Sequence, residues 1–165
     1  MAKLDVIKES FVFQSLSTEE LQKLASISRE EFCASGQHVF REGDQARSLY
    51  IVEEGKVELQ MRVAFSSDHR TASVATVDVI TKGATFGWSA IAKPHIFTGS
   101  AQAADTCKLI VMDGNKLLEL MDSDHTMGYE VMKRFSEVVT ARLVLTRQIL
   151  LSERGLALLS QAHNY

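Results

Sequence analysis

The chain has 165 residues, of which 45% are hydrophobic and 24% charged, a composition typical of a single folded globular domain. Its formal net charge of −3 argues against a dedicated nucleic-acid-binding domain, since such domains usually present a basic surface. No apolar run approaches the length of a membrane-spanning helix, and the first ten residues lack the apolar centre of a signal peptide. We therefore expect a cytoplasmic protein without a membrane partner.

Residues 1–29 are predicted to form two helices. Ser17 precedes Glu20 by three positions, the spacing of a capping box, in which each side chain bonds the other residue's backbone amide. Leucines then recur at helical spacing, so a helix is expected from about Thr18 to Ser28. Apolar residues before it indicate a shorter helix that packs on the rest of the domain.

Residues 30–112 are predicted to form β-strands, because apolar residues now recur at every second position. The clearest strand runs from Lys56 to Val63, where apolar and polar side chains alternate. A strand at Leu49–Val52 precedes it, and Glu54 and Gly55 form the turn between the two. Further strands are expected at Val74–Ile80, at Thr98–Ala104 and around Leu109, with a polar hairpin tip at Ser66–His69. Short strands separated by turns are typical of a sandwich or barrel-like roll.

Helical spacing returns after residue 112. Asp113 is a candidate N-cap for a helix from Asn115 to Met121, and Ser123 or Asp124 for a last helix from His125 to about Arg154. Residues 113–154 are therefore assigned to C-terminal helices. Residues 155–165 are expected to form a tail of a single domain that spans residues 1–165.

The last helix carries a long apolar stripe. Its members are Val131, Phe135, Val138, Arg142, Leu145 and Ile149, widened by Met132, Val139, Leu143 and Leu150. A helix this apolar must pack on the roll or on a second copy of itself, so we expect a homodimer through it. Arg142 falls within the stripe, where it would reach either across the dimer seam or over a ligand pocket.

The chain lacks the patterns of common catalytic and metal sites. Cys33 and Cys107 match no metal-binding spacing and are expected to be reduced and buried as small hydrophobic residues. The five histidines are scattered, without the closely spaced pair that a metal-binding β-roll enzyme needs. No nucleophile elbow, Walker loop or dinucleotide fingerprint is present. We therefore predict no enzyme activity, no catalytic residue, no metal and no cofactor.

Gly43-Asp44, followed by the segment from Leu49 to Val57, resembles the signature of the cyclic-nucleotide-binding family. Gly43 and Gly55 suit tight turns between short strands, and the Asp44 side chain can bond nearby backbone amides. The resemblance implies a mainly β fold: an antiparallel β-roll (a double-stranded β-helix, or jelly roll) with N-terminal helices and a long C-terminal helix. Family transcription factors carry a helix-turn-helix domain after that helix. Too few residues follow Arg154 for one, so no DNA binding by that route is expected.

The resemblance also implies a phosphate-binding cassette at residues 84–100. In the family it reads Phe-Gly-Glu, a short helix, and an Arg followed by Ser, Thr or Ala. Phe86 and Gly87 match this frame and Thr98 is expected to open the next strand, but Trp88 stands at the Glu position and Phe97 at the Arg position. Losing both polar partners would weaken a cyclic nucleotide by roughly two to four orders of magnitude. Cyclic AMP and cyclic GMP binding are therefore not carried over.

The candidate ligand positions are the cassette residues Phe86, Gly87, Trp88, Ser89, Ala90, Phe97, Thr98 and Ser100. Arg62, Lys93 and Arg142 are candidate helper cations. Trp88 is interpreted either as a plug or as an aromatic wall for a flat ligand. Free backbone amides at Gly87, Ser89 and Ala90 could bind an anion without an arginine.

Three functions follow from these observations. The leading prediction is a stand-alone regulatory or sensor module that binds a small molecule or a partner protein and signals through its last helix. The first alternative is a genuine cyclic-nucleotide binder with an atypical cassette. The second is a structural interaction protein with a plugged pocket.

Overall fold

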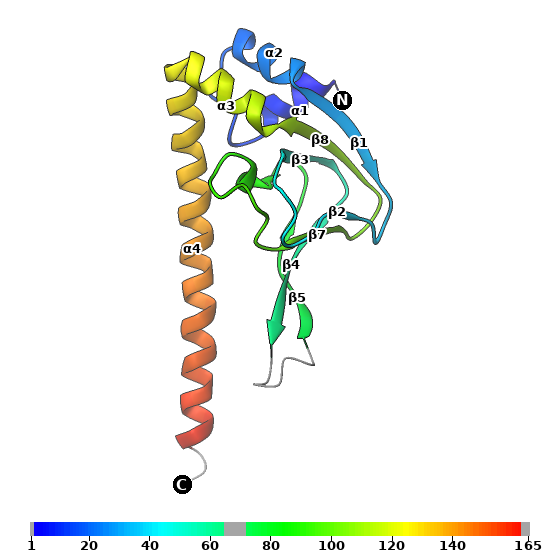
Figure 1. Cartoon of the computed structure of the whole chain (residues 1–165). Helices are drawn as coiled ribbons and strands as arrows, with labels where there is room; N and C mark the ends of the chain where they lie inside the picture. The colour runs from blue at the N-terminus through cyan, green and yellow to red at the C-terminus, as the bar shows by residue number, and fades with distance from the viewer. Residues whose placement is uncertain (1, 65–71, 163–165) are drawn as a thin grey trace.

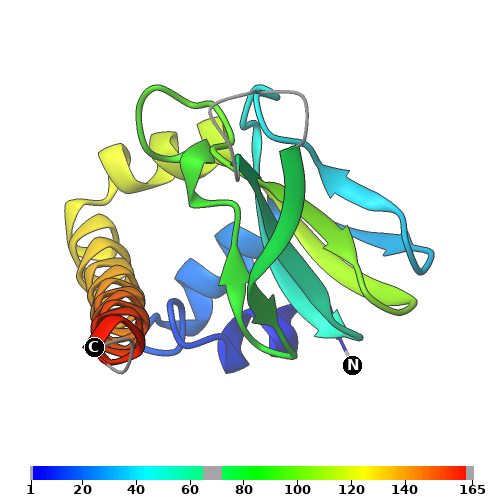
Figure 2. The same ribbon diagram turned by 90° about the horizontal axis from the view of Figure 1, so that it is seen from below.

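The computed structural model describes residues 2–64 and 72–162 (Figure 1). A helical start and a helical end flank a β-roll, and the last helix stands along one side of the roll (Figures 1 and 2). The predicted fold class is confirmed. The predicted hairpin tip at Ser66–His69 lies outside the described residues.

Helices α1 (Lys3–Glu9) and α2 (Thr18–Ser26) form the N-terminal layer. The predicted capping box is confirmed: the Glu20 amide donates to Ser17 Oγ at 3.3 Å, and the Ser17 amide donates to Glu20 Oε2 at 2.6 Å. Helix α2 ends at Ser26 rather than at Ser28. Ser28 begins the first strand, and its hydroxyl donates to the Leu24 carbonyl at 2.7 Å.

The roll consists of two four-stranded antiparallel sheets. The first sheet has the order β1 (Ser28–Cys33), β8 (Cys107–Asp113), β3 (Ser48–Glu54) and β6 (Thr85–Phe86). The second has the order β2 (His38–Phe40), β7 (Ser100–Ala103), β4 (Val57–Ala64) and β5 (Ala72–Ile80). Strand β7 begins at Ser100, so Thr98 precedes the strand instead of opening it.

The turn between β3 and β4 requires its glycine. Gly55 has φ of +84°, and a Cβ there would lie 2.6 Å from the Thr106 carbonyl oxygen. A larger residue would therefore be both strained and in contact with backbone that cannot move away. Next to this glycine, the Lys56 carbonyl accepts from the Ala104 amide at 2.9 Å, beside the β4–β7 pair of Val57 and Ala103. The turn therefore helps to position one wall of the cavity described below.

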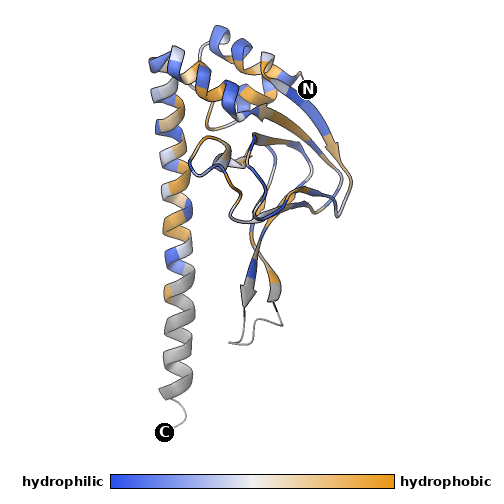
Figure 3. Cartoon of the chain, viewed as in Figure 1, coloured by the Kyte–Doolittle hydropathy of each residue, from blue (hydrophilic) through white to orange (hydrophobic). Residues whose placement is uncertain are grey.

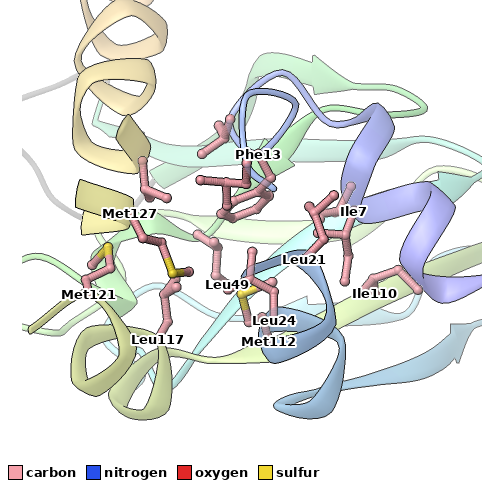
Figure 4. Packing of buried hydrophobic residues seen from close by; sticks show 14 of the residues in the cluster. Ile7, Phe13, Leu21, Leu24, Leu49, Ile110, Met112, Leu117, Met121 and Met127 are labelled. Carbon is pink, nitrogen blue, oxygen red and sulfur yellow. The ribbon is translucent and has the colours of Figure 1, made fainter. Parts of the chain in front are cut away.

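Two hydrophobic clusters lie on the two faces of the first sheet. Leu49 and Ile51 face α1, α2 and the C-terminal helices, and Tyr50 and Val52 face the interior of the roll. The cluster that faces the helices, which includes Leu49 and is shown in Figure 4, is called the helix-side cluster below. The cluster inside the roll, which includes Tyr50, is called the roll-interior cluster. Because both faces are covered, β8 is an almost continuous apolar run from Leu109 to Met112 rather than an alternating one.

Helices α3 (Gly114–Ser123) and α4 (His125–Ala162) complete the chain. The Asp113 carboxylate caps α3 by accepting from the Lys116 amide at 3.0 Å. Asp124, rather than Ser123, caps α4 by accepting from the Met127 amide at 3.1 Å. Helix α4 continues beyond the predicted end near residue 154 and into the predicted tail at 155–165. It extends well past the roll in Figure 1.

The predicted apolar stripe of α4 divides into two parts with different roles. Val131 and Phe135 are buried in the helix-side cluster of this chain, whereas Leu145 is 54% exposed. The Ile149 side chain lies outside the described part. Met132, Val139 and Leu143, which widen the stripe, are each about half exposed, and Figure 3 shows apolar residues at intervals along the half of α4 nearer to α3.

Cys33 and Cys107 are both buried, as predicted, and neither forms a disulfide. The fold places them directly opposite each other on β1 and β8, which their separation in sequence did not indicate. Burial raises the pKa of both thiols above their ordinary value. Over residues 2–64 and 72–162, every helix is too short or too polar to cross a bilayer.

Candidate functional site

A cavity of about 130 Å³ lies where the cassette, strand β4 and helix α4 meet. The structure brings seven of the predicted site residues to its walls: Gly87, Trp88, Ser89, Phe97, Thr98, Ser100 and Arg142. Phe86 and Ala90 do not line the cavity, because both are buried in the roll-interior cluster. Most of the predicted cassette therefore surrounds one space, to which α4 contributes Arg142.

The start of the cassette depends on the conformation of Gly87. This residue has φ of +80°, and a Cβ on it would lie 2.8 Å from the Tyr50 ring. It is followed by a single 3₁₀ turn, η1 (Trp88–Ala90). The Ala90 amide donates to the Gly87 carbonyl at 3.1 Å, so the prediction of a free amide at Ala90 is wrong. One turn also aligns too few peptide dipoles to act as a helix N-terminus.

Phe97 occupies the cassette position where the family pattern has arginine. Its ring stacks on Phe40 with 3.6 Å between centroids and 7° between planes, and the side chain is only 5% exposed. The Phe97 amide donates to the Asp44 carbonyl at 3.0 Å, and its carbonyl accepts from the Gly43 amide at 2.9 Å. The signature turn thus holds Phe97 in place, and hydrocarbon fills the base of the cassette.

Trp88 occupies the cassette position where the family pattern has glutamate, and it connects the roll to α4. The guanidinium carbon of Arg142 lies 4.4 Å from the centroid of the Trp88 ring. Arg142 Nε lies 3.4 Å from the carboxylate oxygen Oδ2 of Asp78 on β5. Burial lowers the pKa of the Arg142 guanidinium, and the negative charge of Asp78 raises it in part. The side chain is charged at neutral pH, as arginine side chains in proteins are.

Arg142 is the one charged residue among the described residues that line the cavity. Of the two positions that the sequence left open for it, the structure shows the one over the pocket. Lys93 is exposed and lies away from the cavity wall. Arg62 is exposed too and lines a neighbouring groove, which shares Gln60, Met61 and Ser100 with the cavity. Neither of these two predicted helper cations is brought to the site.

Sequence reasoning missed several contributors to this site, including the wall residues Leu59, Gln60, Met61, Val77 and Gly99. Phe40 also forms part of the wall and stacks on Phe97. The segment from Phe40 to Glu42 fits the family signature that continues at Gly43, but that resemblance did not identify Phe40 as a site residue. Asp78 holds Arg142 without lining the cavity itself. Its position between Val77 and Val79 was a usable signal, because aspartate is depleted in strands and needs a partner there.

Comparison with known proteins identifies the family and the fold. A sequence model of the cyclic nucleotide-binding domain matches residues 30–124. The chain is 31% identical to a solved structure described as a cyclic nucleotide-binding protein from Geobacter metallireducens GS-15, with a TM-score of 0.72, covering 87% of this chain and 99% of that one.

Two further matches are more distant in sequence. A cyclic nucleotide-binding domain from Methylobacillus flagellatus KT has a TM-score of 0.78 at 20% identity, covering 91% of this chain and 83% of that one. The cGMP-dependent protein kinase egl-4 of Caenorhabditis elegans is 20% identical over 131 residues, which is 78% of this chain. The chain spans only 16% of the length of that kinase.

Proposed function

The chain belongs to the cyclic nucleotide-binding domain family, and from this premise we propose that it is a regulatory module whose helix α4 reports what occupies the cavity. The family is one of regulatory domains rather than of enzymes. The observation that carries the proposal is the contact of Arg142 with Trp88 and Asp78, because it joins the cassette, β5 and α4 at the mouth of the cavity.

The strength of this contact suits a switch. A cation over an aromatic ring contributes about 0.5–2 kcal/mol, depending on how far it is desolvated. The Arg142 and Asp78 side chains are 27% and 36% exposed, so solvent screening limits their ion pair to about 0.2–1 kcal/mol. A tenfold difference in ligand affinity between two helix positions corresponds to about 1.4 kcal/mol. A ligand of modest selectivity could therefore shift the helix.

Packing along α4 supports the same mechanism. The start of the helix is anchored, since Met127 and Val131 are buried in the helix-side cluster. The contact at Arg142 lies further along, where neighbouring residues such as Leu143 are half exposed. A helix fixed at one end and held by one moderate contact further along can pivot when that contact changes.

Ordinary cyclic nucleotide binding is not part of this proposal. Phe97 fills the base of the cassette and supplies no donor for a phosphate. The cavity of about 130 Å³ is also small beside the roughly 300–1,000 Å³ of typical ligand pockets.

We test the switch by measuring the distance between spin labels on the roll and on α4. Lys82→Cys and Gln148→Cys provide exposed attachment sites, and the native thiols are 1% exposed and remain unlabelled. We expect a narrow distance distribution that broadens with Arg142→Gln and stays narrow with the exposed control Arg147→Gln. An unchanged distribution in Arg142→Gln would contradict the proposal.

A homodimer through α4 is the second part of the proposal. Met132, Val139 and Leu143 are 50%, 47% and 48% exposed and lie seven and four residues apart, so they share one face of the helix. The domain leaves this face uncovered, and the extension of α4 beyond the roll gives a second copy room to pack against it. The proposed dimer contact therefore uses the face of Met132, Val139 and Leu143. It does not use Val131 and Phe135, because these two residues are buried within the chain.

Analytical ultracentrifugation tests the dimer. Val139→Glu combined with Leu143→Glu places two like charges on the uncovered face of each helix and should give a monomer. Thr140→Glu changes an exposed residue next to that face and should leave the dimer intact. A monomeric unmodified chain at high concentration would refute this part of the proposal.

A further inference from the structure

We infer that the cavity takes a small aromatic carboxylate with a single ring, whose carboxylate is bound by Arg142 and whose ring lies against Trp88 and the Phe40–Phe97 pair. This inference rests on the proposed function, because it names the ligand of the same site. It follows from the size, the wall chemistry and the charge of the cavity.

The size of the cavity limits the ligand to about one ring. An apolar cavity of about 150 Å³ is known to accept a benzene molecule. The volume here is about 130 Å³, and Arg142 both lines the cavity and has a side chain that is 27% exposed, so we take its side of the wall as the mouth. A single ring therefore fits with its substituent at the mouth, whereas a nucleotide base joined to a ribose and a phosphate does not.

The walls favour an aromatic ring over a sugar. Phe40, Phe97 and Trp88 line the cavity, and the stacked pair of phenylalanine rings presents a flat apolar surface at its base. Aromatic rings packed at 4.5–7 Å contribute about 0.5–1.5 kcal/mol beyond the burial of their area. The uncharged polar side chains on the wall are Gln60, Ser89, Thr98 and Ser100, and the hydroxyl groups of a carbohydrate beyond their reach would face hydrocarbon, which costs free energy.

The charge at the mouth selects an anion. The contact of Arg142 with Asp78 involves Nε, and the Nη hydrogens have no acceptor among residues 2–64 and 72–162. A planar guanidinium offers a fork of donors that matches a carboxylate in two parallel hydrogen bonds. The Trp88 ring holds the guanidinium plane from one side, at 4.4 Å, and so restricts its rotation before a ligand arrives.

Isothermal calorimetry and Trp88 fluorescence with benzoate, benzamide and cyclic AMP test this inference. Trp88 is the only tryptophan, so its emission reports directly on the cavity. We expect benzoate to bind about 10- to 100-fold more tightly than benzamide, which has the same ring without the charge. Arg142→Gln should remove that preference, and Arg147→Gln, an exposed residue on the same helix, should keep it. Circular dichroism checks that both variants fold.

Each outcome has a defined meaning. Equal affinity for benzoate and benzamide, or a preference that survives Arg142→Gln, would overturn the inferred ligand class. Binding of cyclic AMP in place of benzoate would overturn it too, but the proposed function would stand if the spin-label distance then changed. Benzoate binding that leaves the spin-label distance unchanged would support the ligand class and contradict the switch. Absence of binding by all three probes would overturn the inference.

Discussion

Replacing Phe97 by alanine tests whether hydrocarbon fills the base of the cassette. The side chain is 5% exposed, and truncation of a buried phenylalanine typically costs about 3–5 kcal/mol through lost transfer energy and the cavity left behind. The Phe97 and Phe40 rings lie face to face with 3.6 Å between centroids, a geometry less favourable than an offset or edge-to-face pair, so we assign the loss mainly to burial. For a chain of this size, the melting temperature should fall by roughly 6–20 °C.

Urea unfolding followed by circular dichroism measures this loss. Phe32→Ala serves as the matched control because Phe32 is 68% exposed, so its loss should stay below about 1 kcal/mol. A double-mutant cycle with Phe40→Ala should give a coupling of about 0.5–3 kcal/mol, because the two side chains are in contact. If Phe97→Ala costs less than about 1 kcal/mol, or if the cycle is additive, then Phe97 does not fill the site and the argument against cyclic nucleotides fails.

Three further outcomes are expected. Gly87→Ala should destabilise the chain by more than Gly36→Ala in thermal denaturation: both glycines have φ near +80°, but only Gly87 would place a Cβ within 4 Å of other atoms. Cys33 and Cys107 should resist iodoacetamide until the chain unfolds, because burial keeps both thiols protonated and covered. The free energy of unfolding should fall as pH rises above 9.0. Both thiols ionise at this ordinary pKa in the unfolded chain but at a higher pKa in the folded chain, so high pH favours the unfolded state. A variant with both cysteines replaced by alanine should show a weaker decline.

Much of the fold could be predicted from the sequence because the relevant interactions are local. The capping box of Ser17 and Glu20 spans three residues, and the alternation from Lys56 to Val63 reflects a strand with unlike faces. The departure of Trp88 and Phe97 from the cassette pattern could also be seen directly in the sequence.

The arrangement of the site was decided only by the tertiary structure. Phe97 stacks on Phe40, and Arg142 contacts Trp88 and Asp78, all of them residues far apart in the chain. From its spacing along the helix, Arg142 was expected either across the dimer seam or over a ligand pocket. A helical stripe shows which residues share a face, but not what covers that face. Docking of α4 on the roll determined this, since it depends on the shape and packing of surfaces that form only when distant segments meet.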